Sequence, residues 1–472
     1  MSISADLVVL GAGPAGLAAA WRAARTGRSV VVLERASAVG GMAASLTVGG
    51  LRVDHGSHRL HPSTAPEIMA DLRGLLGDDL QVRPRHGRLR VRDRWVGFPL
   101  RPADLARNLP PAMLAGIGAD AVTAPLRRGT PSSYADALRR SLGATLYDQL
   151  YGPFAVKLWG RPGDEIDAEQ ARVRVSADTP AKIARRMLRR GSGGTGRIFH
   201  YPRRGFGQIV DAVADAAVAA GATIELDTEV DLVRPGAEGV EVRTTGGTTV
   251  GARHLFTTAP LPVLARLTSP AAPPAAVAAA SRLRFRAMVL VYLVHSGPTP
   301  WTEFDATYLP DAGTPISRVS EPRNYRVSAD DPTDRTVLCC EIPCSDSDAD
   351  QVWSASPEQL ADLVRDTLAR LGLPPPRLDG PDAVEVRRLR NVYPIYEIGY
   401  AEHLRDLDAW AGALPSVTSF GRLGLFAHDN THHAFAMAYD AVDALGSGPG
   451  GGWDEAAWAL ARERFGAHVV ED

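Results

Sequence analysis

Lysine is nearly missing from this chain of 472 residues, because only Lys157 and Lys182 occur and arginine carries almost all the positive charge. The planar guanidinium of arginine suits phosphates and carboxylates, so this bias favours anion recognition. Cysteine is also scarce, and Cys339, Cys340 and Cys344 are too few and too clustered for a disulfide framework. They are expected on or near a buried strand, which fits a reducing cytoplasm.

Long apolar runs are absent too, since none approaches the roughly 20 residues needed to cross a bilayer. No signal peptide precedes the first predicted strand, and we expect a cytoplasmic protein. The net charge of −2 provides no general attraction to nucleic acid or anionic membranes. With 45% hydrophobic residues, the chain is long enough for two domains or one large domain with insertions.

A glycine-rich unit at the start of the chain is the most informative motif. Residues 6–10 read as a strand, Gly11-Ala-Gly13-Pro-Ala-Gly16 as a turn opening a helix, and residues 29–33 as a second strand ending at Glu34. In such a unit the glycines permit a tight turn, a close pyrophosphate and close helix packing. The helix N-terminus favours the phosphates, and the carboxylate can bind an adenosine ribose. The unit predicts dinucleotide binding.

The rest of the chain alternates between two kinds of pattern. Residues 61–200 read as mostly helical. Helices are expected there at 65–76, 102–109 and 133–142. Further along the chain, they are expected at 206–220, 357–371, 432–445 and 453–465. Strands are expected at 44–48, 51–53, 222–226, 230–233, 239–243, 254–259, 284–294, 317–319, 335–341 and 384–390.

The predicted fold class is therefore α/β, with a discontinuous Rossmann-like domain and an inserted α+β substrate domain. The nucleotide-binding domain would comprise residues 1–60, 201–283 and 412–446. The substrate domain would comprise 61–200 and 284–411. Residues 447–472 would form a flexible glycine-rich linker and a C-terminal helix.

Three motifs resemble the FAD-dependent amine oxidase and protoporphyrinogen oxidase superfamily. They are the glycine unit with Glu34-Arg35 and Gly40-Gly41-Met42, the segment 201–207, and Gly421-Arg422 through Asn430. The resemblance implies FAD as cofactor. The residues that it implies for FAD binding are Gly11, Gly13, Gly16, Glu34, Arg35, Gly41, Met42, Val230, Gly421, Arg422 and Asn430.

Within that superfamily, four segments are similar to UDP-galactopyranose mutase and related flavoproteins: 54–61, 151–174, 318–325 and 392–394. This likeness implies catalytic roles for His58 and Arg318. In redox chemistry at the flavin, His58 or His428 would take the proton. The substrate-binding residues that it implies are Trp159, Arg172, Arg174, Arg318 and Tyr393. Two departures, Phe98-Pro99-Leu100-Arg101 and His428-Asp429-Asn430, fall where the mutases hold sugar and diphosphate.

Two features of these candidates follow from spacing alone. Arg172 and Arg174 alternate with Val173, so on a strand both would face the same side. His55, His58 and His61 recur every three residues, and His428, His432 and His433 cluster later. Neither group is spaced to converge on one ion, and no paired cysteines accompany them, so we predict no metal.

These patterns favour a flavoenzyme acting on a polyhydroxylated, nucleotide-linked sugar-type substrate by redox chemistry at flavin N5. A mutase using reduced flavin is the alternative, and a non-enzymatic binding protein of the same fold is a second one. The strand 284–291 lacks the lysine that many amine-oxidising relatives use, which counts against amine oxidation. A desaturase or porphyrinogen oxidase is disfavoured by the arginine-bearing motifs. The expected partner is a small-molecule substrate; NAD(P)H and other electron donors or acceptors stay open.

Overall fold

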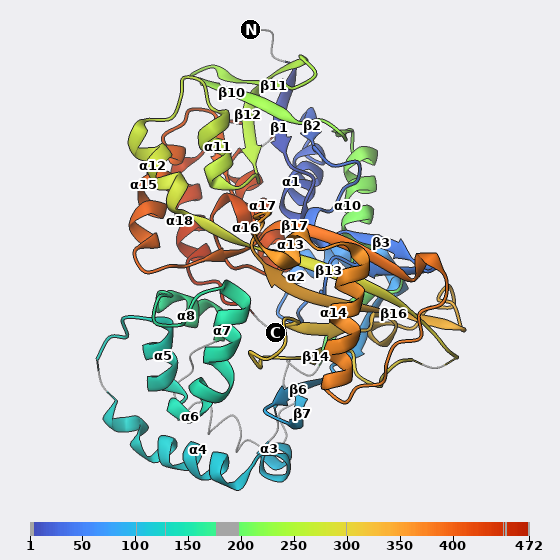
Figure 1. The fold of residues 1–472 in the computed structure, drawn as a ribbon. Coiled ribbons are helices and arrows are strands. Elements are labelled where there is room, and N and C mark those ends of the chain that lie inside the picture. Colours follow the sequence, from blue (N-terminus) through green and yellow to red (C-terminus); the bar gives the residue numbers. More distant parts are fainter. Residues whose placement is uncertain are drawn as a thin grey trace.

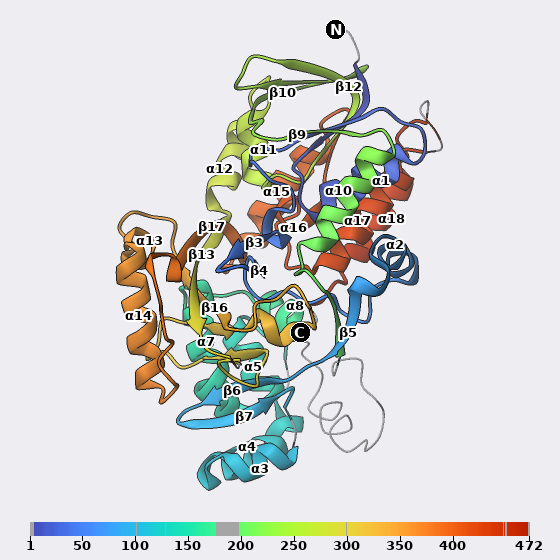
Figure 2. The ribbon, with the colours of Figure 1, turned by 90° about the vertical axis from the view of Figure 1, so that its right-hand side faces the viewer.

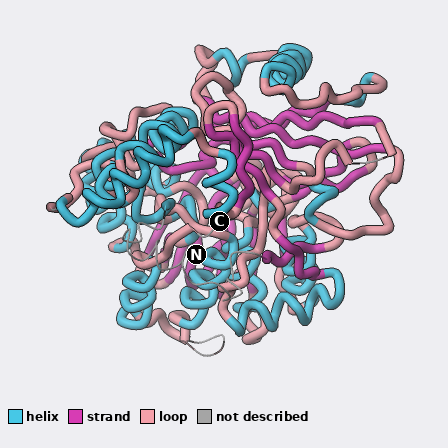
Figure 3. Tube along the Cα trace, turned by 90° about the horizontal axis from the view of Figure 1, so that it is seen from below, coloured by secondary structure: helices cyan, strands magenta, loops and turns pink. Residues whose placement is uncertain are grey.

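Two seven-stranded sheets organise the chain (Figure 1). The computed structural model describes residues 4–100, 102–127, 129–175, 198–298, 300–446, 448 and 451–470. Seen from below, the strands occupy the middle of the molecule and helices largely surround them (Figure 3).

The first sheet is built from strands that lie far apart in the sequence. Its order is β10-β11-β12-β1-β2-β9, and β18 also pairs with β12. β1 runs parallel to β2 and β12, with Leu7 opposite both Val30 and His254. The strands are β1 (Ala5–Leu10), β2 (Val30–Leu33), β9 (Thr223–Glu225), β10 (Val230–Gly236), β11 (Gly239–Thr244), β12 (Thr249–Thr257) and β18 (Val417–Ser419).

Both faces of the first sheet are covered, which explains the apolar run from Leu7 to Leu10 in β1. Leu7 and Val9 enter the core on one face, and Val8 enters the core on the other. Figure 2 shows α1, α10, α17 and α18 on one side and α11 and α12 on the other. These helices and their neighbours are α1 (Pro14–Ala24), α10 (Gln208–Ala219), α11 (Leu261–Leu267), α12 (Pro274–Arg282), α15 (Tyr400–Gly412), α16 (Gly421–Gly424), α17 (Thr431–Asp443) and α18 (Glu455–Phe465).

The second sheet has the order β17-β13-β16-β15-β14-β6-β7. Its strands are β6 (Gly87–Val91), β7 (Arg94–Phe98), β13 (Arg284–Ser296), β14 (Ala306–Tyr308), β15 (Arg318–Ser320), β16 (Arg335–Cys344) and β17 (Val384–Ile395). Helices α13 (Gln351–Ser354) and α14 (Pro357–Arg370) pack on one face, and the hairpin β3 (Ser45–Val48) and β4 (Leu51–Asp54) packs on the other. The three cysteines are free and buried on β16, as predicted.

A group of helices lies below the second sheet in Figure 1. It comprises α3 (Pro102–Asn108), α4 (Pro111–Thr123), α5 (Tyr134–Ser141), α6 (Ala144–Leu146), α7 (Gly152–Trp159) and α8 (Glu169–Val175), while α2 (Pro66–Leu76) packs beside the first sheet. The expectation of mostly helical structure over residues 61–200 was incomplete. β6 and β7 join the second sheet there, and β5 (Leu80–Pro84) pairs with β8 (Ile198–Pro202).

The predicted α/β class is confirmed, and the seven predicted helices coincide with observed helices within two residues at each end. The partition into a nucleotide-binding and a substrate domain stays a prediction. Among the described residues, no helix combines the length and apolar character required to cross a bilayer.

The C-terminal segment packs against the first sheet. The ring of Trp453 stacks on His254 of β12 at 4.9 Å between ring centres, and Trp458, Ala461 and Phe465 of α18 are buried. The Nε2 atom of His254 lies 2.8 Å from Thr418 Oγ1 on β18. His254 thus joins two strands and the C-terminal segment in one buried contact.

Burial of His254 predicts a pH-dependent stability. Burial lowers the pKa of His254 from 6.5 to about 4. Between these values the unfolded chain binds a proton that the folded chain does not, so stability falls as pH falls below 6.5. At pH 5 we expect a loss of about 2 kcal/mol of unfolding free energy from this group.

The variant His254→Gln cannot titrate but can keep a hydrogen bond to Thr418. Denaturant unfolding at pH 7.5 and pH 5 should therefore show a smaller pH effect in His254→Gln than in the wild type. His403→Gln, which changes a partly exposed histidine on α15, is the control. An equal pH effect in all three proteins would contradict the prediction.

Candidate functional site

The glycine turn between β1 and α1 has the geometry of a phosphate-binding loop. Gly11 has a φ of +105°, which favours glycine. A Cβ on Gly16 would lie 1.9 Å from the carbonyl oxygen of Gly11, so only glycine lets the helix approach the turn. No acidic residue occupies the first turn of α1. The unpaired N–H groups at this helix end can therefore receive an anion.

Glu34 stands at the end of β2, beside the turn. Its Oε2 accepts the N–H of Ala12 at 2.8 Å, and its Oε1 accepts the N–H of Ala36 at 2.8 Å. The carboxylate is thereby fixed next to the glycine turn, and its remaining lone pairs can accept hydrogen bonds from a ribose.

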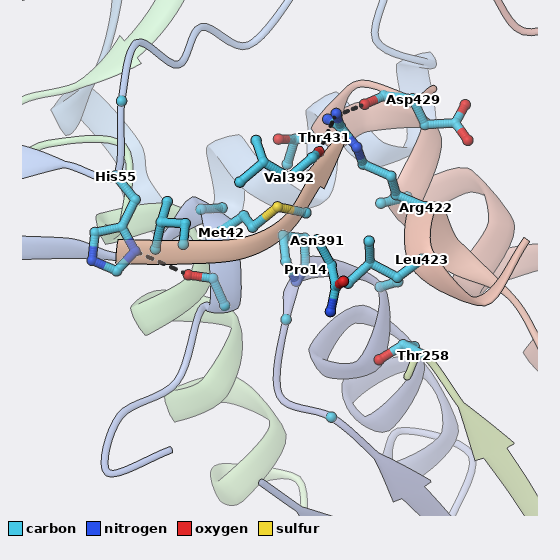
Figure 4. Close-up of a pocket in the computed structure, with 18 of the residues that line it drawn as sticks. Pro14, Met42, His55, Thr258, Asn391, Val392, Arg422, Leu423, Asp429 and Thr431 are labelled. Atoms are coloured by element: carbon cyan, nitrogen blue, oxygen red, sulfur yellow. Dashed lines mark hydrogen bonds between the residues drawn. The ribbon is translucent and has the colours of Figure 1, made fainter. Parts of the chain in front are cut away.

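One cavity of about 860 Å³ runs from this turn into the second sheet. Gly11, Gly13, Glu34, Arg35, Gly41, Met42, Val230, Arg422 and Asn430 line it, together with His58, Arg174, Arg318 and Tyr393. Figure 4 draws lining residues from the glycine turn, β17 and α16, among them Pro14, Asn391 and Arg422. The cavity lies at the upper end of the size range of cofactor sites. The open turn, the fixed carboxylate and this volume fit an adenine dinucleotide such as FAD.

Arg422 lies where the predicted cofactor site meets the second sheet. Its side chain donates to the carbonyl oxygens of Val392 at 2.7 Å and Asp429 at 3.3 Å, as Figure 4 shows. Its buried Nε has no hydrogen-bond partner among the described residues. Burial, and less strongly the charge of Arg174, lowers the pKa of Arg422. An unpaired donor on a buried cation predicts an anionic or carbonyl partner from a ligand.

Arg174 and Arg422 share one aromatic neighbour. Both guanidinium carbons lie 5.2 Å from the ring centre of Tyr393. Arg172 and Arg174 would share a face on a strand, but they lie on the helix α8. Two positions apart on a helix, side chains point in nearly opposite directions. Arg172 is exposed and paired with Glu169, whereas Arg174 lines the cavity.

His58 lines the cavity and stacks on Phe206 at 5.2 Å between ring centres. Its Nε2 contacts the carbonyl oxygen of His55 at 3.0 Å. A carbonyl only accepts, so Nε2 carries the proton and Nδ1 keeps a lone pair. Burial lowers the pKa of His58, so the imidazole is neutral at physiological pH.

Arg318 forms a bidentate ion pair with Glu341, with both N–O distances at 2.8 Å. Although burial disfavours its charge, the Glu341 carboxylate raises the pKa of Arg318 well above its ordinary value. The Oε1 atom of Glu341 also accepts the N–H of Ser57 at 2.9 Å. The pair therefore presents a fixed but largely compensated cation to the cavity.

Four other sequence candidates do not line the cavity: Gly16, Trp159, Gly421 and His428. Trp159 packs its ring edge-on against Tyr134 at 5.0 Å. His428 is buried behind Tyr393, with Nε2 2.8 Å from the carbonyl oxygen of Pro394. Burial lowers the pKa of His428 well below its ordinary value. Direct substrate contact by Trp159, Arg172 or His428 receives no support from this arrangement, and their proposed roles stay predictions. Gly421 approaches the turn instead, where an added Cβ would lie 3.1 Å from the Ala15 Cβ.

Sequence reasoning missed several arginines of the cavity wall: Arg59, Arg85, Arg388 and Arg390. Arg59 directly follows His58 inside the motif at 54–61, and this position could have drawn attention to it. Arg85 follows β5, a strand that was not predicted. Its buried Nη2 has no partner among the described residues, and its guanidinium lies 5.1 Å from the ring of Phe98.

The described residues that line the cavity carry an excess of positive charge. It contains eight arginines and four carboxylates, so 8 − 4 leaves four positive charges. Glu34 binds backbone N–H groups, Glu341 is paired with Arg318, and the Asp429 carboxylate points away from Pro14 and Met42 in Figure 4. Arg85, Arg174 and Arg422 form no ion pair with any described residue. This wall favours an anionic ligand.

Residues 14–437 match the family model described as flavin containing amine oxidoreductase, which covers most of the chain. The chain belongs to this family. It is therefore an FAD-dependent oxidoreductase by family, and the predicted resemblance to the amine oxidase superfamily is confirmed.

The fold is similar to that of reduced UDP-galactopyranose mutase, with a TM-score of 0.80, 20% identity, and coverage of 99% of this chain and 100% of that one. It is also similar to a putative protoporphyrinogen oxidase from Exiguobacterium sp. 255-15, with a TM-score of 0.70, 19% identity, and coverage of 94% and 98%. Phytoene dehydrogenase from Streptomyces griseus is 39% identical over 101 residues, which is 21% of this chain. The matched part spans only 17% of that relative's length.

Because open space lies next to Gly13, a substitution there should lower the affinity for FAD without disturbing the fold. A Cβ at Gly13 would meet nothing within 4 Å, so Gly13→Ala should fold normally. The added methyl group would occupy the groove that a pyrophosphate must enter. We expect FAD affinity to fall by at least ~10-fold, or about 1.4 kcal/mol.

The measurement is the flavin content after gel filtration and the Kd from titration of apoprotein with FAD. Gly74→Ala, at an exposed glycine within α2 that also has nothing within 4 Å, is the matched control. Full flavin content and wild-type affinity in Gly13→Ala would show that the pyrophosphate does not lie at this turn.

Proposed function

We propose that this enzyme oxidises a polyhydroxylated, anionic small molecule of the nucleotide-sugar type. The observation that carries the proposal is the excess of arginine in the cavity wall, with Arg85, Arg174 and Arg422 lacking ion pairs. Guanidinium groups bind phosphate oxygens through charge-assisted hydrogen bonds. A cationic amine would meet repulsion at the same wall, since arginines outnumber carboxylates there.

Each residue has a separate task in this proposal. Bound FAD supplies the two-electron acceptor for oxidation of a C–H next to a hydroxyl group. Arg174 and Arg85 hold the substrate's phosphates, and Tyr393 lies between the phosphate region and the cofactor groove. His58 takes the hydroxyl proton at Nδ1, because its Nε2–H is committed to the carbonyl oxygen of His55. Burial lowers the pKa of His58, which favours the neutral imidazole that can accept this proton.

A second candidate is a sugar-ring isomerisation that needs reduced flavin and produces no net oxidation. The supporting observation is the likeness in fold to UDP-galactopyranose mutase along nearly the whole of both chains. Here Arg174 and Arg318 would stabilise the negative charge that develops on a departing diphosphate. The changed residues at 98–101 and 428–430 are the reason for placing oxidation first.

Anaerobic incubation with a panel of nucleotide sugars separates the two reactions. For oxidation, we expect at least one compound to bleach the absorption of the oxidised flavin. For isomerisation, product would form only in dithionite-reduced enzyme, with no net change in the flavin spectrum. If no compound bleaches the oxidised flavin and none is converted by the reduced enzyme, the substrate class is wrong.

Arg174 should dominate recognition of a nucleotide diphosphate. Replacing it with alanine removes a charge-assisted hydrogen bond, worth about 1.5–3 kcal/mol. We therefore expect Arg174→Ala to bind UDP at least ~10-fold more weakly, measured by perturbation of the flavin spectrum. Arg365→Ala, at an exposed arginine of α14, should leave the Kd unchanged. Unaltered UDP affinity in Arg174→Ala would remove Arg174 from the substrate site.

A further inference from the structure

Three side chains from two distant segments meet beside the cofactor cavity. Asp429 and His433 lie at the start of α17, and His468 lies in the tail that follows α18. Asp429 Oδ1 is 2.9 Å from Nδ1 of His468 and 3.3 Å from Nδ1 of His433. One potential ligand atom from each residue lies within 4.8 Å of the others. Asp429 also lines the main cavity, but its carboxylate points away from Pro14 and Met42 (Figure 4), so the cluster lies beside the cofactor groove rather than in it.

The hydrogen bonds within the cluster leave negative charge and lone pairs without donors. The Asp429 side chain is only 1% exposed, and its Oδ2 has no hydrogen-bond partner among the described residues. His433 Nδ1 accepts the N–H of Asn430 at 3.2 Å, so this nitrogen carries a lone pair rather than a proton. Two acceptor atoms, His433 Nδ1 and Asp429 Oδ1, thus face each other. A cation between them would relieve the repulsion and neutralise the buried carboxylate.

The cluster is also accessible. A separate cavity of about 380 Å³ lies next to it, and its wall includes His433 and His468 together with Ser63, Ala65, Ala436 and Val469. This cavity gives room for an ion to enter and for water molecules to complete its coordination.

We propose that Asp429, His433 and His468 bind one divalent transition-metal ion of the zinc class. Two imidazoles and one carboxylate form a mixed N/O ligand set that suits zinc, whereas calcium and magnesium prefer oxygen ligands throughout. Binding redirects the His433 lone pair from the Asn430 N–H to the ion. The sequence prediction of no metal considered only local histidine groups, and it could not anticipate a ligand from the tail.

The ion would hold the C-terminal tail against α8, the helix that carries Arg174. Two residues after His468, the N–H of Val470 donates to the carbonyl oxygen of Val173 at 2.8 Å, and Val470 lines the main cavity. Val173 precedes Arg174 on α8. The ion is therefore placed to hold the tail and, through it, this turn of α8. The role is structural and does not depend on which reaction the enzyme catalyses.

Metal binding to the FAD-loaded enzyme tests the proposal directly. After dialysis against a chelator, titration with ZnCl₂ in a competing chelator should give one tightly bound ion per chain, confirmed by elemental analysis. His468→Ala and Asp429→Asn should each weaken zinc binding at least ~10-fold. His403→Ala, which removes a histidine far from the cluster in sequence, should bind zinc like the wild type.

Zinc should also raise the melting temperature of the wild type but not of His468→Ala, since binding to the folded state alone stabilises it. If the variants fail to fold, cobalt in the wild-type protein gives an independent measurement. We expect ligand-field absorption at longer wavelengths than the flavin bands, displaced by zinc. Absence of a stoichiometric ion, absence of the cobalt bands, or wild-type zinc affinity in His468→Ala and Asp429→Asn would each overturn the proposal.

Discussion

The contact between the glycine turn and the first helix is the constraint on which the rest of the site depends. A Cβ at Gly16 would overlap the carbonyl oxygen of Gly11, and the Glu34 carboxylate holds the N–H of Ala12. Together they fix the end of β1, the start of α1 and the end of β2 as one rigid corner. Because the strands are parallel, their carboxyl ends meet at this corner, and the cavity opens there.

Charge is distributed unevenly around that cavity, and this gives its two ends different chemistry. Near the turn, polar groups are matched, as in the pairing of Glu34 with backbone N–H groups. Toward the second sheet, arginines outnumber carboxylates. Arg318 is compensated by Glu341, but Arg174 and Arg422, which both contact the Tyr393 ring, form no ion pair with any described residue. Two partly buried like charges are costly without an anion, so the protein maintains a site whose electrostatics are completed by a ligand.

The C-terminal tail connects parts of the site that the sequence separates widely. His468 contacts Asp429, whose carbonyl oxygen accepts a hydrogen bond from Arg422. Gly466 and Val470 bond to Arg172 and Val173 on α8. The tail therefore links residues 421–430 to α8, the helix that carries Arg174. A segment that reads as an appendage in the sequence is part of the wall of the cavity.

The sequence by itself determined the glycine turn with Glu34, the α/β class and most helices, because these depend on local spacing and side-chain period. FAD followed from the resemblance of several motifs to a known family. Tertiary structure alone decided which candidates reach the cavity. Arg174 enters it and Arg172 does not, since a helix rather than a strand carries both. Trp159 and His428 lie behind its wall, and His468 joins Asp429 from a distant segment. Such outcomes depend on the packing of remote elements, which sets side-chain direction and which no local pattern encodes.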